Sequence, residues 1–262
     1  MVFGLIDRLK GRRAPAPIVS VPNVAGRIYA IGDVHGAAEL LERMVARILA
    51  ECRADGQRAT LVMMGDYIDR GDSSRAALDL VASLDEAAEL DPILLRGNHE
   101  AMLLDFIEGR ASATRWLQFG GLQTLLSYGV GGLGAIGAGR GDAAERDLRA
   151  ALTEAMGPHL GLLRGLASSH QSGNVLFAHA GAHPDLPFEL QPERALIWGA
   201  PDFLDRPRAD GRWVVHGHYV VDAPQAADSR IAIDTGAYFS QRLTAVRLDG
   251  GRLDFLTEAL DG

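Results

Sequence analysis

The chain has 262 residues, of which 47% are hydrophobic and 23% charged, so it is long enough to bury a sizeable core in one large domain or at most two. Its 26 basic and 34 acidic residues give a net charge of −8, which argues against general nucleic-acid binding. The single cysteine, Cys52, excludes an intrachain disulfide and a multi-cysteine zinc site, and it favours a reducing compartment, with the cytoplasm as the expected location.

The first 26 residues are expected to form a flexible N-terminal extension. Val2 to Leu9 place apolar residues at helical spacing beside basic ones, and the proline-containing run Ala14 to Pro17 ends this pattern. So short a helix is compatible with weak contact to a membrane surface, although stable binding needs a second signal. No run of 18 or more uncharged apolar residues occurs, so no transmembrane segment is expected.

From Arg27 onward, short strand-like runs alternate with longer runs of helical periodicity, a pattern that predicts βαβ units. Each of the first three runs ends in a polar cluster. The expected strands are 27–31, 60–64 and 92–95, and the expected helices are 38–52, 74–84 and 100–107. Because ligands bind beyond the carboxyl ends of strands in open α/β sheets, the three clusters are expected to converge.

A helical insertion is expected at about 112–168, with helices at 116–127 and 142–166 on either side of a glycine-rich loop. The apolar spacing of Trp116, Phe119, Leu122 and Leu126 is typical of core packing. Residues 132–137 of this loop match the Gly-x-Gly-x-x-Gly pattern of a dinucleotide-binding fingerprint. They follow a helix and not a strand, so no cofactor site is expected there. Further strands are expected at 175–178, 213–215, 231–233 and 243–248.

Side chains able to bind a metal lie where the strands end. They are Asp33, His35, Asp66, Asp69, Asn98, His99, His179, His216 and His218. Carboxylate, imidazole and amide oxygen are the ligands of borderline divalent cations such as manganese, iron or zinc. Two such cations held ~4 Å apart can bind both ends of an in-line phosphoryl displacement, and one bridging carboxylate is needed to hold them so close. The pattern therefore predicts a dinuclear metal site.

Five ordered motifs resemble those of the phosphoprotein phosphatases within the calcineurin-like metallophosphoesterases, most of all the bacterial serine/threonine phosphatases. These motifs are Gly32-Asp33-Val34-His35-Gly36, Gly65-Asp66-Tyr67-Ile68-Asp69-Arg70-Gly71, Gly97-Asn98-His99-Glu100, His179-Ala180-Gly181 and Gly217-His218. The resemblance covers roughly residues 27–248. It implies an α/β fold in one domain at 27–262, a metallophosphoesterase-type β-sandwich flanked by helices (αββα) with a small helical cap insertion.

The resemblance also implies two bound divalent metal ions, with manganese preferred and iron or zinc compatible. One ion is expected on Asp33, His35 and Asp66, and the other on Asp66, Asn98, His179 and His218, so that Asp66 bridges them. A hydroxide held between the ions is then expected to attack the phosphorus directly, without a phosphoenzyme. The neighbouring His216 is expected to support the site and not to bind metal.

Four catalytic residues follow from the same resemblance. His99 matches the general acid that protonates the leaving alkoxide, and Asp69 matches the partner that orients its imidazole. Arg70 and Arg96 match the arginines that hold the phosphoryl oxygens.

One position departs from the pattern of the bacterial relatives. Where these often carry a further phosphate-binding arginine after Ile197-Trp198, this chain has Ala200. Arg206 and Arg208, a few residues on, are the candidates to replace it. If neither does, phosphate affinity or substrate range is expected to differ from that of the resembled enzymes.

The motifs predict a metal-dependent phosphomonoesterase that acts on phosphoserine and phosphothreonine in proteins. The alternative is hydrolysis of symmetrical dinucleoside tetraphosphates, because those enzymes resemble this chain in most motifs but usually carry alanine where Asp69 stands. A remote alternative is a non-catalytic metal-binding module that recruits phosphoproteins. The expected partner is thus a phosphoprotein or a phosphorylated small molecule.

Overall fold

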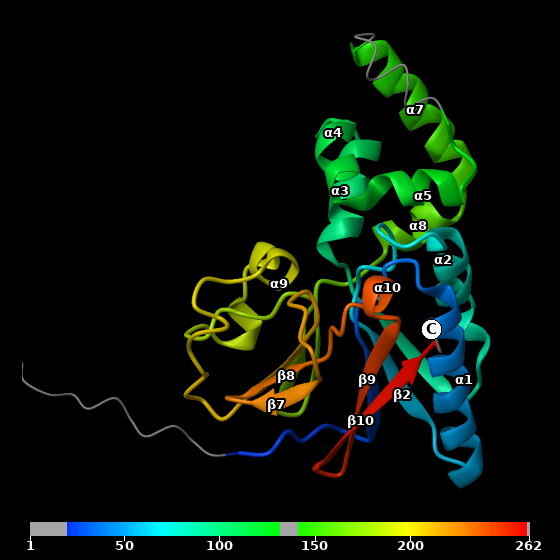
Figure 1. Cartoon of the computed structure of the whole chain (residues 1–262). Helices are drawn as coiled ribbons and strands as arrows, with labels where there is room; N and C mark the ends of the chain where they lie inside the picture. The colour runs from blue at the N-terminus through cyan, green and yellow to red at the C-terminus, as the bar shows by residue number, and fades with distance from the viewer. Residues whose placement is uncertain (1–19, 132–140, 261–262) are drawn as a thin grey trace, which may run out of the picture.

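The computed structural model describes residues 20–131 and 141–260. Two mixed five-stranded sheets pack face to face, and helices cover their outer faces (Figure 1). The α/β sandwich expected from the sequence is therefore confirmed. Within the described ranges, no helix is both long and apolar enough to cross a membrane.

The first sheet has the order β10-β9-β1-β2-β3. Its strands are β1 Arg27–Ile31, β2 Ala59–Met63, β3 Leu90–Leu94, β9 Arg242–Asp249 and β10 Arg252–Ala259. The first three strands are parallel, and β9 pairs antiparallel with both β1 and β10. Parallel strands start and end on the same sides of a sheet, so the loops after β1, β2 and β3 lie together at one edge.

The second sheet has the order β4-β5-β6-β8-β7. Its strands are β4 His170–Ser172, β5 Val175–Phe177, β6 Trp213–His216, β7 Gln225–Ala227 and β8 Arg230–Ala232. The central strands β5, β6 and β8 are parallel, and the two edge strands are antiparallel to their neighbours. The loops that leave β5 and β6 can thus reach the same region as those of the first sheet.

The alternation of side chains along β1 explains how the two layers form. Ile28 and Ala30 pack between the sheets with residues of β5, β6 and β8, whereas Tyr29 and Ile31 pack against the helices on the outer face. All four side chains are buried because both faces of the strand are covered. Burial of this strand on both sides places its carboxyl end deep inside the molecule.

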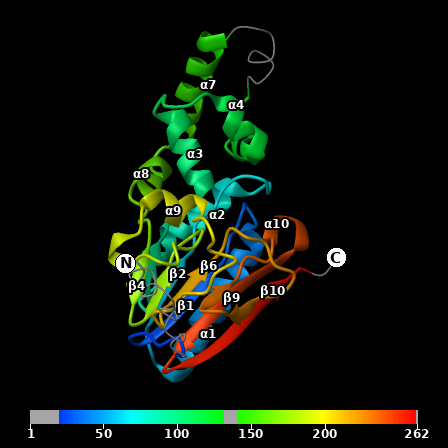
Figure 2. The same ribbon diagram turned by 90° about the vertical axis from the view of Figure 1, so that its left-hand side faces the viewer.

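Helices flank the sheets and build the cap, which extends beyond one end of both sheets (Figure 2). Along the chain they are α1 Ala38–Asp55, α2 Ser74–Ser83, α3 Asn98–Ile107, α4 Ala113–Trp116, α5 Leu122–Ser127, α7 Gly141–Met156, α8 His159–Arg164, α9 Glu193–Trp198 and α10 Ala237–Ser240. Short 3-10 turns occupy Leu84–Glu86 and Phe188–Leu190. The cap consists of α4, α5, α7 and α8, and α3 begins shortly after β3 and rises into it.

The segment before β1 contacts the second sheet. The amide of Asn23 donates to the side chain of Asn174 at 2.7 Å, and the indole of Trp213 donates to the carbonyl of Ser20 at 3.2 Å. The expected amphipathic run Val2 to Leu9 and most of the glycine-rich loop, including the fingerprint-like residues 132–137, lie outside the described residues.

The helix expected at 142–166 is broken, and the one expected at 116–127 contains a bulge. Gly157 and Pro158 separate α7 from α8, since proline cannot supply an amide to the preceding turn. Between α4 and α5, Leu117–Gly121 form a π-helical turn in which Gly120 has a φ of +103°. The carbonyl of Gly120 accepts the backbone amide of Arg70 at 3.1 Å, which ties the cap to the loop after β2.

This bulge corrects the expectation that four apolar residues of the segment pack in the core. Trp116 is buried, but Phe119 is 47% exposed and Leu126 is 63% exposed. An extra residue within a helix rotates the following turn, so the apolar spacing read from the sequence no longer lies on one face.

Gly120→Ala is expected to lower the free energy of unfolding by ~3 kcal/mol, because its Cβ would meet the Arg70 backbone nitrogen at 2.6 Å in a left-handed conformation. Gly129→Ala is the matched control. Gly129 also has a positive φ, +70°, but open space around it, so about 1 kcal/mol of backbone strain is expected. Urea unfolding measures both losses; equal losses would contradict the role of the close contact with Arg70.

Candidate metal centre

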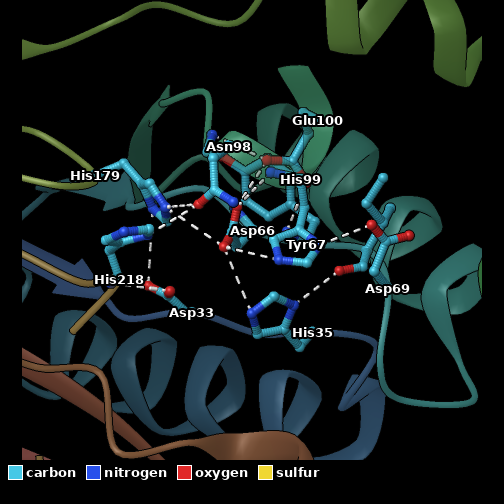
Figure 3. A network of polar contacts seen from close by, with 12 residues as sticks. Asp33, His35, Asp66, Tyr67, Asp69, Asn98, His99, Glu100, His179 and His218 are labelled. Atoms are coloured by element: carbon cyan, nitrogen blue, oxygen red, sulfur yellow. Dashed lines mark hydrogen bonds and ion pairs between the residues drawn. The ribbon is translucent and has the colours of Figure 1, made fainter. Parts of the chain in front are cut away.

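The six residues predicted as metal ligands converge between the carboxyl ends of the two sheets (Figure 3). Asp33 and His35 follow β1, Asp66 follows β2, and Asn98 begins α3 after β3. His179 and His218 follow β5 and β6 of the second sheet. The parallel strands of both sheets therefore deliver the cluster from loops that lie far apart in the sequence.

Several loop residues at this point have left-handed backbone conformations. Positive φ angles occur at His35 (45°), Asp66 (53°), Asp69 (71°), Arg70 (67°) and His218 (62°). Side chains other than glycine rarely adopt this region, and such strain concentrates at functional sites, where the surrounding structure enforces it. The arrangement of these side chains is thus imposed by the fold.

Asp66 lies at the centre of the cluster. Its Oδ2 is 3.5 Å from His35 Nε2, 3.4 Å from His179 Nε2 and 3.9 Å from His99 Nε2. Two groups of side chains with the geometry of a metal site share this carboxylate: His35 with His99, and His179 with His218. Its position between the two groups is the one that a bridging ligand requires.

Two histidines turn their Nε2 atoms toward the centre. Nδ1 of His35 lies 2.9 Å from the carbonyl of Ile68, and Nδ1 of His179 lies 3.0 Å from the carbonyl of Met64. Because a carbonyl can only accept, each Nδ1 carries a proton, and each Nε2 faces Asp66. At His179 burial acts to lower the pKa, but the charges of Asp66 and Asp33 outweigh it and raise the pKa to about 10. Burial lowers the pKa of His35 to about 3, so that its ring is neutral at physiological pH.

Asn98 meets the group that includes His179, whereas Asp33, expected with His35 and Asp66, belongs to neither group and lies beside His218. Asn98 Oδ1 lies 3.0 Å from His179 Nε2 and 2.9 Å from His218 Nδ1, so the amide oxygen and both imidazoles meet at one point. Asp33 Oδ2 accepts the backbone amide of His218 at 3.0 Å. These contacts connect the loops of the two sheets directly through ligand atoms.

The buried negative charge of the centre favours the binding of cations. Asp33 Oδ1 is buried and has no hydrogen-bond partner in the described part of the chain. Burial, together with the charge of the neighbouring Asp234, raises the pKa of Asp33 well above its usual value. Buried carboxylates are stable when they are paired with cations, and the set of carboxylate, imidazole and amide donors fits two divalent metals. The dinuclear character expected from the sequence thus agrees with the donors that are present.

His99 stands beside the metal ligands and is held by Asp69. Its Nδ1 donates to Asp69 Oδ2 at 2.7 Å, while its Nε2 is buried without a partner among the described residues. Burial acts to lower the pKa of His99, but the carboxylates of Asp66 and Asp69 outweigh it and raise the pKa above its ordinary value. The imidazole is therefore able to carry a proton on the nitrogen that faces the centre.

The cap fixes the orientation of Asp69. Its carboxylate accepts the indole N–H of Trp116 at 2.9 Å and the hydroxyl of Thr124 at 2.6 Å. Neither residue was recognised as part of the site from the sequence, because Trp116 and Thr124 lie about fifty positions from Asp69 and belong to no motif. An indole and an uncharged hydroxyl are common in any helix, so the local sequence does not indicate this role.

Glu100 is a further site residue to which the sequence analysis assigned no role. Its buried carboxylate accepts the amides of Asp66 and Tyr67, each at 2.8 Å, and that of Gly97 at 2.9 Å. Burial, and then the charge of Asp66, raises the pKa of Glu100 to about 7. Glu100 sits at the third position of α3, where a glutamate that turns back to free amides is a recognisable helix-start pattern.

The arginines expected to bind phosphate differ in their surroundings. The guanidinium of Arg70 lies 5.3 Å from the ring centre of Tyr238, whose ring in turn lies 5.5 Å from that of His35. Arg96 instead donates to the carbonyls of Arg164 and Leu166, each at 3.3 Å. Arg70 is thus adjacent to the metal ligands, whereas Arg96 is turned toward the cap.

Neither candidate for the replacement of the arginine missing at Ala200 contacts a ligand residue. Arg206 pairs with Asp185 on the surface, at 2.7 Å. Arg208 is buried over the ring of Phe188 and is paired with Asp210. The expectation that phosphate affinity or substrate range departs from that of the resembled enzymes therefore stands as a prediction.

His216 lies next to the centre without pointing into it. Its Nδ1 is 2.9 Å from the carbonyl of Gly217, and its ring packs edge-on against Phe203 at 5.0 Å between ring centres. These contacts agree with a supporting role.

The family model of the calcineurin-like phosphoesterases matches residues 26–222 of this chain, which include every ligand of the candidate centre. The chain belongs to this family. The buried histidine and aspartate clusters are the site that such a metallophosphoesterase requires.

Curated relatives include a protein phosphatase and several bis(5'-nucleosyl)-tetraphosphatases. Serine/threonine-protein phosphatase 1 of Salmonella typhimurium is 38% identical over 94 residues, which are 36% of this chain and 38% of the relative. The symmetrical bis(5'-nucleosyl)-tetraphosphatase of Dechloromonas aromatica is 39% identical over 83 residues, or 27% of its length. The chain thus matches less than two fifths of the length of each of these two relatives.

Two other tetraphosphatases match along most of their length, with 97% and 88% of the relative covered. The symmetrical enzyme of Thioalkalivibrio sulfidiphilus is 25% identical, with 87% of this chain and 97% of the relative covered. Among solved structures, a protein provisionally described as a diadenosine tetraphosphatase superposes with a TM-score of 0.58 at 22% identity, over 94% of this chain and all of that one. A Saccharomyces cerevisiae serine/threonine phosphatase gives 0.54 at 16% identity, over 94% of this chain and 85% of that one. These structures share the fold.

Asp66→Asn is expected to abolish tight binding of both metals, because one neutral amide would replace the carboxylate shared by the two groups of ligands. Metal analysis after dialysis against manganese measures the effect, with a loss from about two ions per chain to less than one. Asp85→Asn removes an exposed carboxylate and serves as the control. An Asp66→Asn protein that still holds two ions per chain would refute the bridging role.

Proposed function

We propose that this chain is a dinuclear-metal phosphohydrolase whose substrates are dinucleoside polyphosphates. The observation that carries the chemistry is the central position of Asp66, shared by two groups of metal-binding side chains. The choice of substrate is supported by the tetraphosphatase relatives, since these match the chain over 84% of its length or more in two cases. The asymmetrical enzyme of Oceanobacillus iheyensis is the second of the two, at 27% identity.

The side chains of the site have distinct tasks in this reaction. Asp33, His35, Asp66, Asn98, His179 and His218 are proposed to hold the two metals. When bound, such ions supply an activated water and neutralise charge on the phosphoryl group. Arg70 is proposed to bind phosphoryl oxygens where negative charge develops. His99 is proposed to protonate the leaving oxygen from Nε2, while Asp69 fixes its ring by the bond to Nδ1.

A second candidate function is the dephosphorylation of phosphoserine and phosphothreonine in proteins, and Asp69 is the observation that favours it. An alkoxide leaving group needs a strong proton donor, and the 2.7 Å contact between Asp69 and His99 provides one. The local match to the Salmonella phosphatase supports this candidate as well. A non-catalytic phosphoprotein-binding module has less support, because the candidate ligands and His99 are all present.

A comparison of two substrate classes tests the proposed function. After chelation and addition of manganese, the chain is expected to hydrolyse diadenosine tetraphosphate with a kcat/KM ~100-fold above that for a panel of phosphoserine and phosphothreonine peptides. Such a ratio corresponds to ~2.7 kcal/mol of transition-state discrimination. A preference of the same size for the peptides would favour the second candidate instead.

His99→Asn is expected to slow hydrolysis of an alkyl phosphate by ~10²- to 10⁴-fold, and that of p-nitrophenyl phosphate far less, because an aryl leaving group needs no proton. Steady-state kinetics on both esters measures the effect, and metal analysis confirms that the ions remain. His170→Asn, on the edge strand β4, is the control. Equal losses on the two esters would remove His99 as the acid.

A further inference from the structure

A cleft between α3 and α9 has no part in the reaction described so far. Its volume is about 280 Å³, near the lower bound of ~300 Å³ for small-molecule pockets. The residues that line it are Arg96, Ala101, Leu104, Asp105, Arg110, Glu193, Arg194, Ile197 and Trp198. Three arginines face two carboxylates, so the lining is cationic within a chain that is acidic overall.

Both walls of the cleft are connected to metal-ligand residues. On α3, Asn98 lies on the same helix face as Ala101 and Asp105, three and seven positions further along. On the other wall, the carbonyl of Leu196 in α9 accepts the amide of Ala180, the residue after His179, at 2.8 Å. A substrate bound at Asn98 and His179 can therefore continue into the cleft, over ~10 Å along α3.

Hydrogen-bond donors in the cleft remain available. Arg96 Nε is buried without a partner in the described part of the chain, and the nearest carboxylate oxygen, on Glu193, lies 3.6 Å from its Nη1. Arg194 forms no hydrogen bond or ion pair with any described residue, whereas Arg110 is held by Asp105 at 2.7 Å. Two backbone carbonyls hold the Nη2 of Arg96, which leaves its Nη1 and the guanidinium of Arg194 as donors for an anion in the cleft. Guanidinium groups bind phosphate oxygens strongly.

The far end of the cleft offers an aromatic surface. Trp198 is half-buried and also lines a second, small cavity, and the guanidinium of Arg115 lies 5.1 Å from its ring centre. Arg115 thus covers one face of the indole, and a heteroaromatic base can stack only on the other, where one such stack contributes ~1–3 kcal/mol. Arginines alone would suit any anion, but the indole adds a preference for an aromatic ring.

We propose that this cleft binds one nucleotide of the substrate, with its phosphates on Arg96 and Arg194 and its base against Trp198. The proposal rests on the proposed function, since a dinucleoside polyphosphate carries a second nucleotide beyond the phosphate that reacts. A phosphopeptide could use the arginines but supplies no base for the indole. The cleft would thus select for nucleotides at a distance from the reacting atoms.

Equilibrium binding of ADP to the chelated protein tests the cleft without turnover. Calorimetry is expected to show binding to wild type that weakens at least 5-fold in Arg194→Gln and in Trp198→Leu, whereas Trp198→Phe keeps an aromatic face and stays within 2-fold. Arg146→Gln, an exposed arginine of α7 outside the cleft, is the matched control for charge and is expected to bind as wild type does. ADP affinity that is unchanged in both Arg194→Gln and Trp198→Leu overturns the proposal.

Kinetics with manganese separates failure of the cleft from failure of the proposed function. In Arg194→Gln and Trp198→Leu, the loss of kcat/KM on diadenosine tetraphosphate is expected to exceed the loss on p-nitrophenyl phosphate by at least 5-fold. A wild type that hydrolyses the tetraphosphate while both variants lose equally on the two substrates overturns the cleft alone. A wild type that hydrolyses phosphopeptides but not the tetraphosphate contradicts both. Arg194 is exposed, so Arg194→Gln still decides the result if Trp198→Leu does not fold.

Discussion

The burial of carboxylates around one point constrains the rest of the structure. Asp33 and Asp66 lie beside Asp234 in an interior region from which water is excluded, and like charges in such a region repel strongly. The histidines turned toward Asp66 offset part of this repulsion only when they are protonated, but a protonated nitrogen has no lone pair with which to bind a metal. Bound cations resolve this conflict, which makes the centre a structural element as well as a chemical one.

The two sheets hold these buried side chains in place. Three parallel strands of one sheet and two of the other end around the same point, and five residues there accept strained backbone conformations. Glu100 illustrates the support that this needs, because its one carboxylate accepts two amides of the loop after β2 and one amide of the loop after β3. A loop held in this way cannot relax when the metals leave, so the ligands stay ordered in advance of binding.

Sequence reasoning predicted the parts governed by local pattern and by motif. The run 27–31 alternates like a strand, and 38–52 has the spacing of a helix. Both patterns come from the local sequence alone, and the observed β1 and the start of α1 agree with them. It did not predict β10, whose exposed edge mixes polar and apolar residues, nor the π turn at Gly120, which depends on a contact with Arg70. Likewise, the orientation of Arg96 and the bonds from Trp116 and Thr124 to Asp69 arise only from packing between distant segments, which spacing cannot reveal.

Those two bonds have a consequence for how the protein can diversify. The cap looks like a module that could be exchanged among relatives to change specificity, yet Asp69, the partner of the proposed proton donor His99, relies on an indole and a hydroxyl that the cap itself contributes. In a chimaera with a foreign insertion, His99 would remain, but Asp69 would lose both of its hydrogen-bond donors from the cap. Lineages that replace this insertion must therefore re-evolve an anchor for Asp69, or abandon the carboxylate and accept substrates whose leaving groups need no proton.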